Sequence, residues 1–504
     1  MQFCTQCGQK IEQEGECPNC SSGNSGHVGK NQRKGGINKT LIGVLMVAIL
    51  VVGGFVILYQ SPAEKANELF VEASSLVQSI PELQNESFLN AFNSANEAQT
   101  AVDTILSEYS ETDLAVNIVK GEAKIGPYSS KELEEVISQL GSKAEAETSP
   151  LAAAHYIALN SEGNSYEKYT ELLFIAQDYA ELGDYEKANG ILTYTEEMSR
   201  YLEDELGKEG ILAETAIGYA YIKQFDRALQ VVEKIQDEKL PTFTLVALTF
   251  IASELAENGQ MDKAVEVLSE AYELHSEEEW FRLWASGHLA AAYAKVGEKG
   301  RALEMLGQTI EKVESDGINR NIAYGYLRAG EYDKALQTIV DIDGEGHQLY
   351  VILKLLREIE DNNMDKISDI LPQALRVAET VSSNIGIRSI IIAEIAGSYA
   401  KIGEKDKAVE LLTNSLELVK DENHPHPYFK AQALAFIAGS FAEAGQEDKA
   451  LEIAYLTLQE IQKITDDISQ ARGLSKLGYE MEERDLKTNK EMQVLLHSLI
   501  SNYH

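Results

Sequence analysis

Residues 396–412 read AGSYAKIGEKDKAVELL, and this stretch decides the fold because its pattern returns along most of the chain. The final alanines of successive copies lie 32 to 42 residues apart, when a degenerate copy, NNMDKI, ending at Ile367 is included. Self-similarity at such a period indicates a repeat architecture. The seven clear turns are LGDYEKA (182–188), KQFDRA (223–228), NGQMDKA (258–264), VGEKGRA (296–302), AGEYDKA (329–335), IGEKDKA (402–408) and AGQEDKA (444–450).

Two further positions recur with each turn. Twelve residues before the final alanine stands another alanine, and nine residues before it stands an aromatic residue in six of the seven copies. A glycine in six of the turns fits a left-handed helix C-cap, so each copy predicts two helices joined by a short connection. The residues are Ala176, Ala216, Ala252, Ala290, Ala323, Ala396 and Ala438 at the first position, and Tyr179, Tyr219, Leu255, Tyr293, Tyr326, Tyr399 and Phe441 at the second.

This pattern resembles the tetratricopeptide repeat, in which small residues let two helices approach and an aromatic residue fills the space between them. The resemblance implies an all-α fold, a TPR-like α-solenoid of helical hairpins over 161–504, with a concave face that binds proteins or peptides. Residues 60–160 also have helical periodicity, broken at Gly126–Pro127 and Pro150, and we expect them to cap the array. The last helix pair, 466–504, is expected to cap the other end. Units longer than usual, without the family's tryptophan and closing proline, favour an irregular superhelix.

All four cysteines, Cys4, Cys7, Cys17 and Cys20, lie in residues 1–22 as two CxxC pairs. This spacing favours a structural zinc site with four thiolate ligands over a redox dithiol, an iron site or two disulfides. The segment resembles the short zinc ribbon at the N-terminus of many bacterial membrane proteins, where the ribbon usually stays cytoplasmic.

Residues 23–40 are rich in Gly, Ser and Asn and form a flexible basic linker. Residues 41–59, LIGVLMVAILVVGGFVILY, carry no charge and are long enough for one transmembrane helix. A cleaved signal peptide is the alternative, which the long apolar run disfavours. The cations before the span place the N-terminus in the cytoplasm and the array outside a bacterial inner membrane.

The formal net charge of -37 disfavours nucleic acid as a partner. The sequence has no P-loop, GxSxG, HExxH or GxGxxG motif, so we expect no enzyme. Positions that line the groove in the tetratricopeptide family imply a cationic and aromatic patch for a peptide or a carboxylate-bearing segment, and ordinary surface variation is the alternative. The patch consists of Trp284, Lys295, Arg320, Tyr324 and Arg328.

Together these features predict a membrane-anchored, single-pass scaffold for protein–protein interactions, which can also self-associate through stacked side surfaces. The alternative function is a transmembrane sensor or regulator that couples the external array to the zinc ribbon. The flexible linker makes this alternative weaker, because it transmits force poorly.

Overall fold

The computed structural model describes residues 2–3, 10–11 and 61–503, except 164, 237–240, 275–278, 311–314, 343, 363, 381–384 and 421–425. The chain divides into two compact units, 1–65 and 66–504. In the first unit, strands β1 (Gln2–Phe3) and β2 (Lys10–Ile11) pair in antiparallel fashion. The predicted zinc ligands, the linker and the predicted span 41–59 lie outside the described residues. None of the helices in the described ranges is long and apolar enough to cross a membrane.

The second unit begins with a small bundle of helices. Its members are α2 (Pro62–Glu86), α3 (Phe88–Glu108), α4 (Asp113–Val119) and α5 (Ser130–Thr148). Helix α3 packs against α5, and the hydroxyl groups of Ser79 and Ser94 lie 3.2 Å apart between α2 and α3. The predicted breaks are confirmed: Gly126 has a positive φ, and Pro150 is the first residue of α6.

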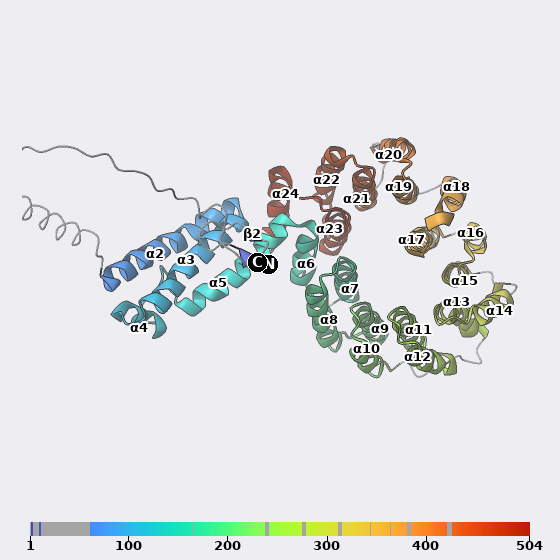
Figure 1. Ribbon diagram of the computed structural model, residues 1–504, viewed down its shortest axis with the longest axis horizontal. Coiled ribbons are helices and arrows are strands. Elements are labelled where there is room, and N and C mark those ends of the chain that lie inside the picture. The colour runs from blue at the N-terminus through green and yellow to red at the C-terminus, as the bar shows by residue number, and fades with distance from the viewer. Residues whose placement is uncertain are drawn as a thin grey trace, which may run out of the picture. The chain divides into compact units, whose positions relative to one another are not determined.

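The array that follows is a succession of helical hairpins, as predicted. Figure 1 shows the first helix of each hairpin on the inside and the second on the outside. Helix α6 (Pro150–Asn160) precedes the hairpins. The inner helices are α7 (Tyr166–Glu181), α9 (Glu205–Tyr221), α11 (Thr242–Glu257), α13 (Glu279–Lys295), α15 (Asp316–Arg328), α17 (Glu345–Asn362), α19 (Ile385–Lys401), α21 (Pro427–Glu443) and α23 (Asp467–Glu482). The outer helices are α8 (Tyr185–Ser199), α10 (Phe225–Val232), α12 (Met261–Glu273), α14 (Lys299–Ile310), α16 (Tyr332–Val340), α18 (Met364–Thr380), α20 (Lys405–Lys420), α22 (Glu447–Ile461) and α24 (Lys490–Ile500).

Each of the seven clear turns has the predicted left-handed C-cap. In the turn at 402–408, Gly403 has φ 88°, and the N–H of Glu404 donates to the carbonyl of Tyr399 at 2.9 Å. The aromatic position therefore also supplies the carbonyl that closes the helix. The same bond recurs in the other six turns, with N–H donors Asp184, Gln224, Gln260, Glu298, Glu331 and Gln446. The alanines twelve residues before each final alanine are buried, so the predicted close approach of helices is confirmed.

Lys223 provides a direct test of this turn, because it takes the glycine position with φ 62°. A left-handed conformation costs a residue with a Cβ about 1 kcal/mol. We expect Lys223→Gly to raise the free energy of unfolding by about 0.5–1 kcal/mol, and Gly403→Ala to lower it by a similar amount. Thermal melts of the two variants would measure both changes; a lower melting temperature for Lys223→Gly would contradict the prediction.

The two ends of the array meet, which the repeat pattern does not predict. Helix α23 packs along α6 and contacts α7, while α24 packs on α5 (Figure 1). The contact with α6 is close because Gly478 has no side chain: a Cβ there would lie 2.2 Å from the backbone nitrogen of Leu151. The segments 60–160 and 466–504, which we expected to cap opposite ends of the array, are therefore in contact. The hairpins form a closed ring instead of an open superhelix.

Candidate functional site

The five residues of the predicted patch lie on two neighbouring inner helices. Trp284 and Lys295 belong to α13, and Arg320, Tyr324 and Arg328 belong to α15. These helices touch backbone to backbone, because a Cβ on Gly287 would lie 2.3 Å from the carbonyl carbon of Asn321. The amide of Asn321 also donates to the carbonyl of Trp284 at 3.2 Å.

The patch separates into two parts along these helices. Lys295, Tyr324 and Arg328 gather at the C-terminal ends, where the Arg328 guanidinium lies 5.9 Å from the centre of the Tyr324 ring. Trp284 and Arg320 lie closer to the N-terminal ends of α13 and α15. The structure therefore brings three of the five residues together and leaves the other two at a distance along the same helices.

The cations of the first part are already paired within the chain. Lys295 contacts Glu257 at 2.7 Å and Glu358 at 3.1 Å, and Arg328 contacts the same two carboxylates at 2.7 and 2.5 Å. Burial raises the pKa of Glu257, but Lys295 and Arg328 outweigh it and hold that pKa below its ordinary value. A carboxylate from a partner would have to displace these internal ones.

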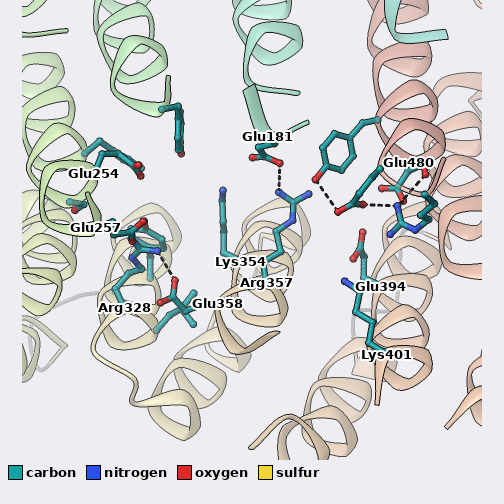
Figure 2. Close-up of a pocket in the computed structure, with 18 residues that line it drawn as sticks. Glu181, Glu254, Glu257, Arg328, Lys354, Arg357, Glu358, Glu394, Lys401 and Glu480 are labelled. Atoms are coloured by element: carbon teal, nitrogen blue, oxygen red, sulfur yellow. Dashed lines mark hydrogen bonds and ion pairs between the residues drawn. The ribbon is translucent and has the colours of Figure 1, made fainter. Parts of the chain in front are cut away.

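The same end of the ring encloses a cavity of about 430 Å³. Seven carboxylates and five cations line it, together with aromatic side chains, so its surface is strongly polar. Many of these charges are paired. Arg357 of α17 contacts Glu181 of α7 at 3.1 Å (Figure 2), and Arg484 contacts Glu480 of α23, four residues earlier in the chain, at 2.9 Å.

Sequence reasoning identified Lys295 and Arg328 but missed that their position in the repeat is charged in six of the seven copies. Seven residues before each final alanine stand Glu181, Tyr221, Glu257, Lys295, Arg328, Lys401 and Glu443. This position ends the inner helix, and five of the seven residues, all but Lys295 and Glu443, line the cavity. A charged residue at one fixed repeat position was thus the available signal. Arg357 and Glu480 had no such signal, because α17 and α23 belong to units without the clear turn.

Polar contacts hold the seam where the ring closes. Arg472 of α23 donates to Glu171 of α7 at 2.6 Å, and the Ser475 hydroxyl donates to Asp178 at 2.6 Å. Nearby, the Ser149 hydroxyl donates to Glu482 at 2.5 Å. Burial raises the pKa of Asp178 to about 7, against the opposing effects of Ser475 and Lys476. Burial in the closed seam therefore favours the protonated form of the Asp178 carboxyl group.

The raised pKa of Asp178 predicts a pH dependence. Because the pKa is about 7 in the fold and 3.8 ordinarily, the stabilisation from the protonated form is complete below about pH 4. It declines as the pH rises through 7. We expect Asp178→Asn, which cannot ionise, to melt at a higher temperature than the native chain at pH 8 and to lose this advantage at pH 5. Melting curves over this range measure the effect; parallel profiles for the two proteins would refute it.

Comparisons with known proteins support the repeat fold. A tetratricopeptide repeat family model matches residues 392–425, which include most of α19 and all of α20. No curated protein matches. Among solved structures, the chain is similar to one described as the crystal structure of Ton1535 from Thermococcus onnurineus NA1, with 17% identity, covering 61% of this chain and 99% of that chain. Its TM-score of 0.25 is too low to carry a structural argument. The repeat and the helical architecture indicate a scaffold for protein–protein interactions.

Proposed function

We propose that this protein is a membrane-anchored, non-enzymatic scaffold that binds protein partners through its ring of helical hairpins. The ring carries the proposal, because it presents a repeated helical surface to partners, and most of the cations that line its cavity are paired within the chain. The uncharged stretch 41–59 and the cations before it support an anchor with the ring outside the membrane. The two CxxC pairs support a cytoplasmic ribbon with structural zinc.

The partner surface that we favour is the N-terminal part of the predicted patch. Trp280 is 55% exposed and stacks on Trp284, with ring centres 6.5 Å apart. Trp284 in turn lies 5.0 Å from the ring of His288. Tryptophan is enriched among the residues that dominate the binding energy of protein interfaces. Trp280, which sequence reasoning did not select, therefore joins Trp284 as an apolar anchor.

Arg320 supplies the polar component of this surface. Its guanidinium donates to Asn321 at 3.2 Å and lies 5.7 Å from the ring centre of Tyr350, which fixes the side chain by contacts that are not ion pairs. The guanidinium makes no ion pair with a described residue, so it is available to pair with a carboxylate of the partner. An apolar side chain followed by an acidic one is the partner segment that fits.

The test is quantitative crosslinking of the full-length protein in native membranes. Trp280→Ala and Arg320→Ala should each reduce recovery of the crosslinked partners at least tenfold. Tyr185→Ala is the matched control, because Tyr185 is an aromatic residue on α8 that is 47% exposed, and its loss should leave recovery unchanged. Equal recovery from all three variants would discard this surface.

Two measurements test the anchor and the ribbon. Protease added to intact spheroplasts should digest the ring, and the purified chain should contain one zinc that is lost when Cys4 and Cys7 are replaced by Ser. A protected ring would refute the orientation. Crosslinked partners found on the cytoplasmic ribbon and altered by loss of Trp280 would instead favour the sensor.

A further inference from the structure

Three charged side chains that line the central cavity make no ion pair with any described residue. They are Glu254 of α11, Lys354 of α17 and Glu394 of α19. Figure 2 shows all three directed into the cavity, with Lys354 between the two carboxylates. The arginines of the same cavity behave differently, because each of them contacts at least one carboxylate.

The environment of these three groups disfavours their charged forms. Burial raises the pKa of Glu254 to about 7, and the neighbouring Glu257 adds to the effect. Burial and the nearby Glu480 raise the pKa of Glu394, while burial and Arg357 lower the pKa of Lys354. Groups that serve only to hold a fold together are usually paired, so unpaired charges of both signs in one cavity indicate a binding site.

Aromatic rings form the wall beside Glu254. Phe250, one helical turn before Glu254, stacks on Tyr324 with ring centres 6.4 Å apart, and Tyr221 lines the same space. The faces of such rings attract an ammonium or guanidinium group. Glu254 and these rings together suit a cation, and the volume of about 430 Å³ is that of a small-molecule site.

We propose that the cavity binds a small diamino carboxylic acid of the basic amino-acid class. One cationic group pairs with Glu254 beside the aromatic rings, the second pairs with Glu394, and the carboxylate pairs with Lys354. A ligand with two cationic groups and one carboxylate matches the two unpaired glutamates and the one unpaired lysine of the cavity, which favours this class over simpler ligands. A simple diamine would leave Lys354 unpaired, and a neutral or acidic amino acid would leave one of the two glutamates unpaired.

The test is calorimetric titration of the purified full-length protein with L-lysine, L-glutamate and putrescine. L-lysine should bind and raise the melting temperature, whereas L-glutamate should not bind and putrescine should bind at least tenfold more weakly. Glu254→Gln and Lys354→Met should each weaken the binding of L-lysine at least tenfold. Glu270→Gln and Lys487→Met serve as matched controls, because both residues are exposed and lie outside the cavity.

The free protein gives a second readout that does not depend on the ligand. Because Glu254 is an unpaired carboxylate, Glu254→Gln should raise the melting temperature of the unliganded chain. A lowered melting temperature would show that Glu254 stabilises the ring and would overturn the proposal. So would the absence of any response to millimolar L-lysine, unchanged binding in both cavity variants, or putrescine binding as tightly as L-lysine. None of these results bears on the partner surface at Trp280, so the two proposals fail separately.

Discussion

Gly478→Val should open the ring and lower the free energy of unfolding by about 3 kcal/mol. Gly478 lies on α23 where it crosses α6, and a Cβ there would lie 2.2 Å from the nitrogen and 2.6 Å from the Cα of Leu151. The atoms in the way belong to backbone and cannot rotate aside, so the two helices must separate. Separation exposes Leu151, which is now fully buried, and removes the contacts that join the ends of the array. Thermal melts and limited proteolysis near 149 and 482 would measure both effects.

The matched control is Gly190→Val. Gly190 also lies within a helix, α8, but a Cβ there meets no atom within 4 Å. Valine is a slightly better helix former than glycine, so this variant should change the free energy of unfolding by less than about 0.5 kcal/mol. If both valine variants behaved alike, the close crossing of α23 and α6 would be refuted.

The second large effect is expected at the ion pair of the seam. Glu171 is fully buried, and its carboxylate accepts a hydrogen bond from Arg472 at 2.6 Å. Arg472→Met leaves this carboxyl without a partner in an apolar setting, which costs about 3 kcal/mol. Burial already raises the pKa of Glu171 in opposition to Arg472, and loss of the arginine should raise it further. The variant should therefore lose stability as the pH rises.

A double variant separates the charge from the packing. Replacing both residues, Glu171→Met with Arg472→Met, removes the unpaired charge while keeping the side-chain volume similar, and it should recover most of the lost stability. Urea denaturation at pH 7 of the native chain, the two single variants and the double variant would give the four free energies of unfolding of this double-mutant cycle. Additive losses would mean that the two residues act independently and that the ion pair does not hold the seam.

The hairpins could be predicted because each is encoded locally. The small residues, the aromatic residue and the turn of one copy all lie within about seventeen residues, and helix capping and close packing act over that distance. Gly403 shows the encoding at its clearest, since the sequence predicted both its left-handed conformation and the helix boundary beside it. Lys223 shows that the local pattern tolerates a poor residue when the packing around it is right.

The closure of the ring could not be predicted, because it depends on contacts between distant parts of the chain. Ser149 and Glu482 are separated by 333 positions, and Arg472 and Glu171 by 301. No periodic pattern specifies such pairs; the small angle between successive hairpins, summed around the array, brings them together.

The candidate site was likewise predictable only where it depends on the local repeat pattern. Tetratricopeptide positions correctly placed Lys295 and Arg328 on inner helices, and Glu257 stands at the same repeat position. The repeat pattern did not predict the role of Glu358. This residue belongs to the degenerate unit, and its carboxylate pairs with both Lys295 and Arg328. The part of the patch formed by Lys295 and Arg328 is therefore a closed ion-pair network in space, although the sequence pattern indicates a cationic surface.

The central claim is that α23 closes on α6, and one distance measurement tests it directly. Spin labels would be placed at Ser142→Cys on α5 and Lys487→Cys after α23, in full-length protein whose four native cysteines are replaced by Ser. The Thr488 hydroxyl donates to the carbonyl of Thr148 at 2.8 Å, and Ser142 lies six residues from Thr148, about 9 Å along the helix. Pulsed electron spin resonance should therefore give a narrow distribution centred at about 20 Å. A broad distribution centred at about 50 Å or beyond, as for hairpins stacked about 10 Å apart in an open superhelix, would contradict the account.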